Sequence, residues 1–455
     1  MTVRGLMEEG LGVGLKGFCG QHSPMVKKAF KYELGENFAL RMDAEDPLAV
    51  FKSRFYHIPG SIYMDGNSLG LMSRDAEETL LRVANEWKTL GIAGWGKGKI
   101  PWIDYGESLG DLEAPLVGAE PGEVVVTNST TVNLHNLVAT FYEPKGRRRK
   151  ILADELNFPS DLYALYADIL LRGGDPEKDL VLVKGRKGLI DEDDVVEQMT
   201  GEVALALLPS VYYKSGQLAD MARLTKVAHR KKIIIGFDCS HSVGVVPHFF
   251  DVWDVDFAFW CNYKYMNAGP GGTASLYVNR RLFGVRPGLA GWWGNSRSTM
   301  FNMETRYDQA KNAAAWQIGT INMFSAAPLE GSLRIMGEAG IERIRKKSIK
   351  LTGYLMFLID EMLGKAPYNY SIVTPREPER RGGHVGVAHR EGWRINQALI
   401  ARGVIPDFRP PNIMRLAPIP LYVGYHDVWR VAQHLKGVVD NKEYLKYTDD
   451  RATVT

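Results

Sequence analysis

The sequence predicts an α/β protein with a mostly parallel seven-stranded sheet in a large domain and a smaller α+β domain at its C-terminal end. Three observations lead to this fold class. Short apolar runs alternate with helical segments from about residue 75 to residue 330, as in doubly wound sheets. Beyond residue 330 the pattern changes to long helices and isolated strands. The 455 residues are also too many for one compact core.

The apolar runs of the large domain are the expected strands of the sheet. Most have four to six residues and are rich in β-branched or aromatic side chains, as buried strands are. The seven strands are expected at Glu123–Thr127, Ile151–Ala153, Leu180–Val183, Val203–Leu208, Ile233–Phe237, Phe257–Trp260 and Ala274–Val278. Helices are expected at about 75–87, Asp161–Leu171 and Met221–Arg230, and a glycine-rich loop at Gly91–Gly98.

The C-terminal part contains one long helical stretch, Leu329–Leu363, followed by shorter elements. These are strands at Tyr370–Val373 and Gly383–Ala388 and helices at Gly392–Arg402 and Tyr425–Val439. We therefore expect four regions: an N-terminal segment (1–74) that packs on the small domain and on a dimer partner, the large domain (75–330), the small domain (331–440) and a frayed polar tail (441–455).

Composition and charge narrow the class of protein. With 56 basic and 53 acidic residues the net charge is +3, which gives no electrostatic basis for binding nucleic acid. Three cysteines cannot form a disulfide framework, so a reducing compartment is expected. No apolar run approaches the roughly 20 residues of a membrane helix, and the acidic start of the chain is unlike a signal peptide. These features predict a cytoplasmic protein that does not bind membranes.

A lysine at a strand exit is the first candidate for chemistry. Lys264 follows the expected strand Phe257–Trp260 and precedes a glycine-rich turn. Active sites of open α/β sheets lie at such exits. Burial there lowers the pKa of an ammonium group and so favours the amine that forms an imine. A surface lysine would show the same local pattern, so Lys264 needs support from other residues.

Asp238 and His241 give that support. Asp238 ends another expected strand, 26 residues before Lys264, and His241 lies in the loop that follows. Pyridoxal 5'-phosphate (PLP) needs a carboxylate that keeps its pyridine nitrogen protonated, and Asp238 is placed to supply it. His241 is placed to support that carboxylate or the phosphate, although an ordinary loop histidine remains an alternative.

A third motif completes the pattern. The strand that ends at Thr127 leads through Asn128 and Ser129 to Thr130 and Thr131, where a helix is expected to begin. The free N–H groups of a helix N-terminus bind phosphate, and the two threonine hydroxyls add donors. A simple Ser/Thr helix cap would look the same in isolation.

Two other patterns do not support a site. Gly12–Gly17 matches G-x-G-x-x-G, but it follows no convincing strand, so we reject dinucleotide binding. His384 and His389 have no carboxylate or cysteine at metal-ligand spacing, and we assign no metal.

Together these motifs resemble the kynureninase family, PLP-dependent enzymes of fold type I. The resemblance runs from about Asp46 to Val439, nearly the whole chain. The segments that carry it are Tyr63–Leu71, Thr130–His135, Phe158–Asp161, Gly236–His241, Tyr263–Gly269, Gly291–Gly294 and Arg415–Tyr422. It implies a hydrolase of tryptophan catabolism, the kynurenine pathway and NAD biosynthesis that cleaves the Cβ–Cγ bond of L-kynurenine to anthranilate and L-alanine.

The resemblance also implies a role for each matching residue. Lys264 would form the Schiff base, Asp238 would pair with the ring nitrogen, and Tyr263 would act as a general acid. Arg415 would clamp the substrate α-carboxylate with its planar guanidinium. Residues around the cofactor would be Thr130, Thr131, Phe158, Pro159, Ser160, Asp161, Asp238, His241, Tyr263, Lys264, Trp292 and Thr320.

The family's pattern further implies a homodimer, because Trp292 and Thr320 would reach the site from the partner subunit. Trp95, Gly319 and Thr320 match the pocket of members that prefer kynurenine over 3-hydroxykynurenine, unless Trp95 merely packs beside Trp102. One departure is visible. Pro209 stands where many members have a small polar residue, which leaves that cofactor contact unassigned, with Ser210 as a substitute.

Four alternatives remain open. A cysteine desulfurase needs a thiol in its C-terminal half, and no cysteine follows Cys261. A class V aminotransferase would need a keto acid. A non-enzymatic relative would not need to keep Lys264, Asp238 and Arg415 together. A kynureninase for a ring-substituted substrate remains open, because one methyl group changes discrimination by only about 1–3 kcal/mol.

Overall fold

The computed structural model describes residues 30–449. The chain divides into two compact units, residues 1–33 and residues 34–455, and the elements given below belong to the second unit. The Gly12–Gly17 pattern lies outside the described residues. Among the helices of residues 30–449, none has the length and apolar character needed to cross a membrane.

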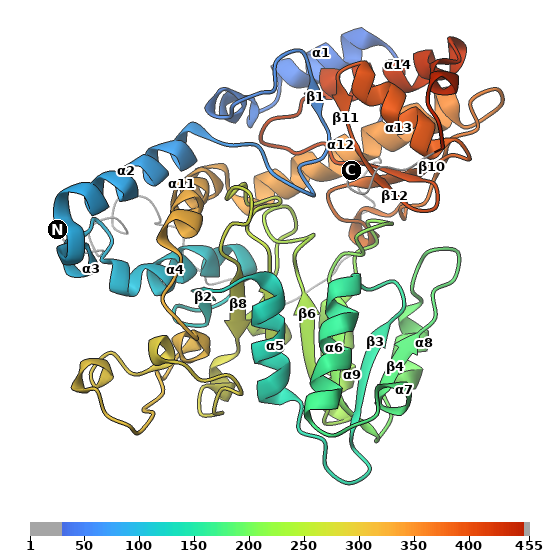
Figure 1. The fold of residues 1–455 in the computed structure, drawn as a ribbon. Helices are drawn as coiled ribbons and strands as arrows, with labels where there is room; N and C mark the ends of the chain where they lie inside the picture. Colours follow the sequence, from blue (N-terminus) through green and yellow to red (C-terminus); the bar gives the residue numbers. More distant parts are fainter. Residues whose placement is uncertain (1–29, 450–455) are drawn as a thin grey trace. The chain divides into compact units, whose positions relative to one another are not determined.

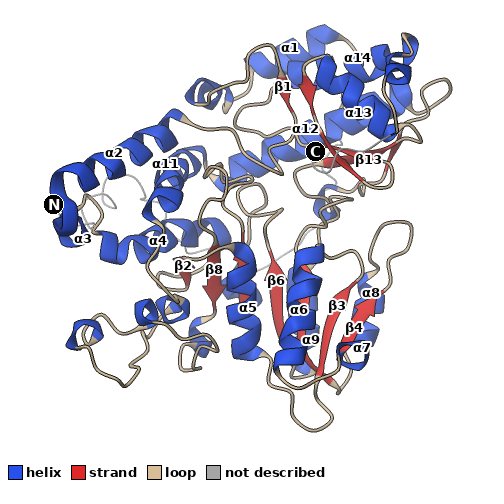
Figure 2. Ribbon diagram, in the orientation of Figure 1, coloured by secondary structure: helices blue, strands red, loops and turns tan. Residues whose placement is uncertain are grey.

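The larger sheet has seven strands in the order β2-β8-β7-β6-β5-β3-β4 (Figure 2). β8 runs antiparallel to both of its neighbours, β2 and β7, and the other neighbouring strands pair in parallel. The strands are β2 (Val124–Val126), β3 (Lys150–Asp154), β4 (Leu180–Val183), β5 (Val203–Pro209), β6 (Ile234–Asp238), β7 (Phe257–Trp260) and β8 (Ser275–Val278). The predicted mostly parallel, seven-stranded fold is confirmed, and each strand end lies within one residue of its predicted position.

Helices pack on this sheet through apolar side chains. α5 (Thr130–Phe141) and α6 (Pro159–Leu171) lie side by side over one face of the sheet (Figure 1). Buried apolar residues from both helices and from the strands form one core cluster between them. α6 begins two residues before its predicted start because proline is well suited to a first helical turn, whose N–H groups have no partner. α9 (Met221–Arg230) has its predicted bounds.

The remaining helices of this region are shorter or lie at its margins. They are α1 (Glu36–Ala44), α2 (Arg74–Leu90), α3 (Gly94–Lys97), α4 (Tyr105–Val117), α7 (Pro176–Asp179), α8 (Glu192–Gln198) and α10 (Phe250–Trp253). The prediction of a glycine-rich loop at Gly91–Gly98 is wrong in part, because this segment forms a 3-10 turn and then α3.

A second sheet has the order β12-β13-β10-β9 and is antiparallel throughout. Its strands are β9 (Ser371–Ile372), β10 (Val385–Ala388), β12 (Asp407–Arg409) and β13 (Ile413–Leu416), with α13 (Gly392–Ala401) and α14 (Tyr425–Asp440) nearby. A separate parallel pair joins β1 (Ile62–Tyr63) to β11 (Val404–Ile405). The four regional boundaries remain a prediction, because residues 34–455 form one compact unit.

Two C-terminal expectations need correction. The stretch Leu329–Leu363 is not one helix but the end of α11 (Met323–Ala339) and the whole of α12 (Ile341–Leu363). Gly340 separates them at φ +75°, a left-handed conformation that favours glycine and ends the first helix. The tail is ordered at first, since a 3-10 turn at Glu443–Lys446 is held by an Arg402–Glu443 ion pair.

Candidate active site

The candidate residues gather at the carboxyl ends of neighbouring strands. Asp238 is the last residue of β6, and Lys264 lies in the loop after β7, its neighbour in the sheet. α5 starts at Thr130, shortly after β2. Strand ends of an open α/β sheet meet at one edge, and the three predicted motifs therefore come together there.

Lys264 is paired with a neutral histidine. Its Nζ lies 3.0 Å from His241 Nε2 and 5.9 Å from the centre of the Phe158 ring. Burial holds the pKa of His241 well below its ordinary value, and the nearby charges of Lys264 and Arg415 lower it further. A neutral imidazole accepts a hydrogen bond, so His241 can hold the Lys264 amine in place.

Asp238 and Asp161 form a carboxyl pair. The backbone N–H of Ser240 donates to Asp238 Oδ1 over 2.8 Å. Burial, and then the contact with Asp238, raises the pKa of Asp161 well above its ordinary value, while the Lys264 charge lowers it. Two adjacent carboxylates do not both ionise readily, and the fully buried Asp161 is the member of the pair that keeps its proton.

The N-termini of α5 and α6 face each other through their hydroxyl residues. Thr131 Oγ1 and Ser160 Oγ share a hydrogen bond of 2.8 Å, and Thr130 Oγ1 donates to Cys261 Sγ over 3.1 Å. The N-cap of α5, Ser129, makes no side-chain cap bond, so the first N–H groups of this 12-residue helix keep their capacity to bind an anion.

These groups fit the cofactor expected from the sequence. PLP presents an aldehyde, a protonated ring nitrogen, a flat ring and a phosphate. The site offers an amine, the carboxyl group of Asp238, the 40% exposed ring of Phe158 and a helix N-terminus. His241 Nδ1 is buried and has no hydrogen-bond partner in the structure, as expected of an atom that faces a ligand.

Arg415 reaches the cluster from β13 of the second sheet. Its side chain is 1% exposed, and its Nε and Nη2 pair with the Asp407 carboxylate. Its Nη1 donates to the Tyr213 carbonyl over 2.9 Å, and its Nη2 donates to Ser68 Oγ over 2.8 Å. Most of the guanidinium donors are therefore in use, and a substrate carboxylate would have to share or displace Ser68 and Tyr213.

Tyr263 is half-buried next to this cluster. Burial raises the pKa of its phenol well above the ordinary value, and Cys261 raises it further. The phenol therefore stays protonated at neutral pH. Pro159 opens α6 beside Ser160.

Four predicted residues do not join the cluster within this chain. Trp95 packs on Trp102 and Trp293, with ring centres 5.7 and 5.5 Å apart. Trp292 is 47% exposed and donates to the Met300 carbonyl. No hydrogen bond or ring contact of the described chain connects Trp95, Trp292, Gly319 or Thr320 to Lys264.

Sequence reasoning missed several supporting residues. Asp407 and Tyr213 bond Arg415, and His384, considered only as a metal ligand, lies with its ring 5.8 Å from that of His241. Burial and the Arg415 charge lower the pKa of His384 to about 3. The strands on either side of Pro410–Asn412 were not predicted; recognising them as a hairpin would have placed Asp407 opposite Arg415. Nothing local marks Tyr213 or His384.

Ser210, the residue after Pro209, bonds the backbone of Asp238. Its backbone N–H and its hydroxyl both donate to the Asp238 carbonyl, over 2.8 and 3.0 Å. The hydroxyl also shares a hydrogen bond with Ser242 Oγ. Ser210 therefore supports the backbone that presents Asp238.

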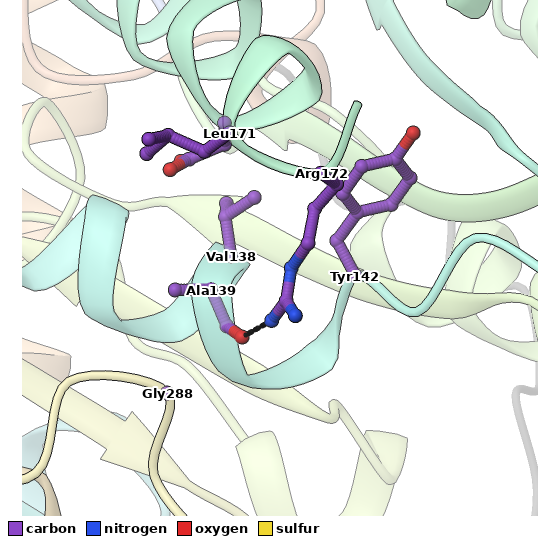
Figure 3. Close-up of a pocket in the computed structure, with 7 residues that line it drawn as sticks. Val138, Ala139, Tyr142, Leu171, Arg172 and Gly288 are labelled. Atoms are coloured by element: carbon purple, nitrogen blue, oxygen red, sulfur yellow. Dashed lines mark hydrogen bonds between the residues drawn. The ribbon is translucent and has the colours of Figure 1, made fainter. Parts of the chain in front are cut away.

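A cavity of about 180 Å³ lies apart from this cluster, between α5 and α6. Figure 3 shows that Arg172 donates to the Ala139 carbonyl at its edge. None of the residues that line this cavity is a predicted site residue. The lining consists of Val138, Ala139, Tyr142, Asp168, Leu171, Arg172 and Gly288.

Comparisons with known proteins identify close relatives. The family model "Kynureninase C-terminal domain" matches residues 344–435. The chain is 53% identical over 418 residues to the kynureninase of Geobacillus thermodenitrificans, with 92% of this chain and 97% of that protein covered. It is 52% identical over 420 residues to the kynureninase of Shouchella clausii, with 92% and 98% covered.

Solved structures share the fold at low identity. The cysteine desulfurase of Thermococcus onnurineus has a TM-score of 0.72 at 18% identity, with 86% of this chain and 98% of that one covered. A C-DES variant with glycine covalently linked to its PLP cofactor has a TM-score of 0.73 at 16% identity, with 84% and 98% covered. At this identity the likeness concerns the fold alone.

Proposed function

Because this chain belongs to the kynureninase family, we propose that it hydrolyses L-kynurenine to anthranilate and L-alanine with PLP as its cofactor. The enzyme is a hydrolase of carbon–carbon bonds in ketonic substrates, and it acts in tryptophan catabolism. One observation carries the proposal: the Lys264 amine lies 3.0 Å from a neutral imidazole and beside Asp161, whose carboxyl group interacts with both Lys264 and Asp238.

Bound PLP supplies an electron sink for cleavage of the Cβ–Cγ bond. The chain's own residues orient the reactants and move protons. Lys264 takes the α-proton, and neutral His241 accepts a hydrogen bond from its ammonium form and so holds it in place. Asp238 keeps the ring nitrogen protonated, while Asp161 supports Asp238 without adding charge. Phe158 covers one ring face.

Arg415 binds the substrate carboxylate in this proposal. Its guanidinium is fixed by Asp407 before substrate arrives, so little side-chain freedom is lost on binding. Tyr263, half-buried beside the cluster, donates a proton to the β-carbon in this proposal.

The activity test also separates the alternatives. The purified protein with PLP should release fluorescent anthranilate and alanine from kynurenine without any keto acid. Dependence on a keto acid would indicate an aminotransferase. A desulfurase mechanism lacks support in the sequence, because no cysteine follows Cys261.

We expect unsubstituted kynurenine to be preferred over 3-hydroxykynurenine. Trp95, Gly319 and Thr320 are the residues that the resemblance associates with members preferring unsubstituted kynurenine. The triple variant Trp95→His, Gly319→Ser and Thr320→Asn should shift the ratio of the two kcat/KM values toward 3-hydroxykynurenine by about 10–100-fold. Trp429→His, a surface tryptophan of α14, should leave the ratio unchanged. An unshifted ratio in the triple variant would remove these residues from the pocket.

We also propose a cytoplasmic homodimer in which Trp292 and Thr320 complete the partner's site. Trp292, Phe301 and Met303 are large, exposed apolar side chains close together in sequence, which supports burial against a second copy.

A mixing experiment tests the shared site. Lys264→Ala and Trp292→Ala protomers, each inactive as a homodimer, should regain about one quarter of wild-type activity after subunit exchange, because half of the dimers then hold one intact site. Two Lys264→Ala preparations serve as the control. No recovery despite exchange would place Trp292 in its own subunit's site or outside both.

A further inference from the structure

The loop that carries Lys264 has a well-defined stem. It leaves β7 after Trp260 and enters β8 at Ser275, so it comprises residues 261–274. Trp260 and Ser275 are direct partners in the antiparallel pairing of the two strands. The position of Lys264 relative to the sheet therefore depends on how this pair of residues is held.

Glu113 of α4 bonds both stem residues. The indole N–H of Trp260 donates to its Oε1 over 3.2 Å, and the Ser275 hydroxyl donates to its Oε2. All three side chains are 0% exposed. One carboxyl group thus ties the end of β7 and the start of β8 to the same helix.

The contact continues into the loop through Asn262, two residues before Lys264. Its amide Nδ2 donates to Ser275 Oγ over 2.7 Å and to the Thr273 carbonyl over 2.9 Å. Its own carbonyl accepts the N–H of Ala268 over 2.9 Å. Glu113, Ser275 and Asn262 therefore form a continuous hydrogen-bonded path from α4 to the Lys264 segment.

α4 must lie close to the sheet for Glu113 to reach the stem. Gly110, one turn earlier in α4, allows this, because a Cβ there would lie 2.1 Å from the Val124 carbonyl oxygen. Glycine at this position brings the helix backbone against β2.

Burying a carboxyl group costs folding free energy unless hydrogen bonds or a paired charge compensate the loss of water. No lysine, arginine or histidine of residues 30–449 forms an ion pair with Glu113, and burial raises its pKa to about 7. Two hydrogen bonds compensate only part of the cost of removing an acid from water, and an apolar side chain would fill the space without that cost. The presence of Glu113 is therefore better explained by its bonds to Trp260 and Ser275 than by a gain in the stability of the fold.

We propose that Glu113 is a positioning residue that fixes the Lys264 loop through Trp260, Ser275 and Asn262. The inference rests on the proposed function only in that Lys264 carries the cofactor. Glu113 does not touch substrate or cofactor and acts through the loop stem.

The test compares three variants of the PLP-loaded enzyme. Glu113→Gln keeps the shape and one acceptor oxygen, Ser275→Ala removes one donor, and Glu113→Met removes both bonds at similar volume. The matched control is Glu123→Gln. Glu123 is also buried, but it bonds the backbone N–H of Arg280, beyond the opposite end of β8.

Two measurements report on the Lys264 position: kcat with kynurenine, and the pH at which the visible band of the bound cofactor converts. In Glu113→Gln we expect kcat about tenfold lower with KM changed less than about twofold, and a band midpoint displaced by about half a pH unit or more. Ser275→Ala should show the same change in the band, and Glu113→Met a larger one. Glu123→Gln should change neither, whatever its melting temperature.

Wild-type kcat and band midpoint in Glu113→Gln and Ser275→Ala would overturn the proposal, even if both variants melt earlier. If Glu113→Met does not fold, the two milder variants decide the question. The band measurement needs no substrate, so it still tests Glu113 if kynurenine is not hydrolysed. Failure of the proposed function and failure of this inference are therefore distinguishable.

Discussion

Replacing Lys264 with alanine is expected to lower turnover of kynurenine by about 10⁴-fold or more, because one side chain both binds the cofactor covalently and transfers the α-proton. The visible absorption band that depends on the lysine should disappear, while PLP still binds through the remaining contacts. Steady-state release of anthranilate and an absorption spectrum of the purified variant measure the two effects.

Lys150→Ala is a suitable control for the loss of a lysine. Lys150 lies on β3, where it forms an ion pair with Glu202 away from the cluster. Its variant should keep both activity and spectrum. A Lys264→Ala protein with the wild-type band would place the Schiff base on another lysine and would contradict the assignment.

Replacing Asp238 with asparagine should lower kcat by about 10²–10³-fold, with a much smaller loss of PLP affinity. The amide keeps the size and the hydrogen bond from Ser240 but cannot hold the ring nitrogen in its protonated form. Without that charge the ring accepts electrons poorly, and the step that needs an electron sink slows. kcat and a PLP titration of the apo protein separate the two quantities.

Asp161→Asn gives the matched comparison. Asp161 holds its proton beside Asp238, so an amide that donates the same hydrogen bond should cost less than the change at Asp238. A larger loss in Asp161→Asn than in Asp238→Asn would mean that Asp161, and not Asp238, carries the essential charge. Unchanged turnover in Asp238→Asn would remove its proposed role.

The fold by itself does not distinguish this enzyme from its structural neighbours. A desulfurase and a C-DES variant share the architecture at 16–18% identity. The assignment instead depends on relatives above 50% identity over 92% of the chain. Function in such a fold is set by the residues at the strand ends.

The strands of the larger sheet were predictable because each is a short apolar run between turn residues. Phe257–Trp260 and Leu180–Val183 were predicted with their observed bounds for this reason. The break at Gly340 was missed, because a single glycine within a helical pattern is locally compatible with a continuous helix and only the packing of α11 and α12 decides its conformation.

The sequence by itself determined which residue types stand at the strand exits: an amine at Lys264, a carboxylate at Asp238 and hydroxyls at Thr130 and Thr131. These follow from local pattern, because a strand and the loop after it are adjacent in the chain. Their order along the chain was enough to indicate the cofactor and the family.

Only the tertiary structure decided the partners of those residues. His241 is neutral because it is buried beside Lys264 and Arg415, and Arg415 bonds Ser68 across 347 positions of sequence. Glu113 reaches Trp260 and Ser275 across 147 and 162 positions. Charge state and hydrogen bonding depend on distance and burial in space, and a pattern of neighbours along the chain contains neither.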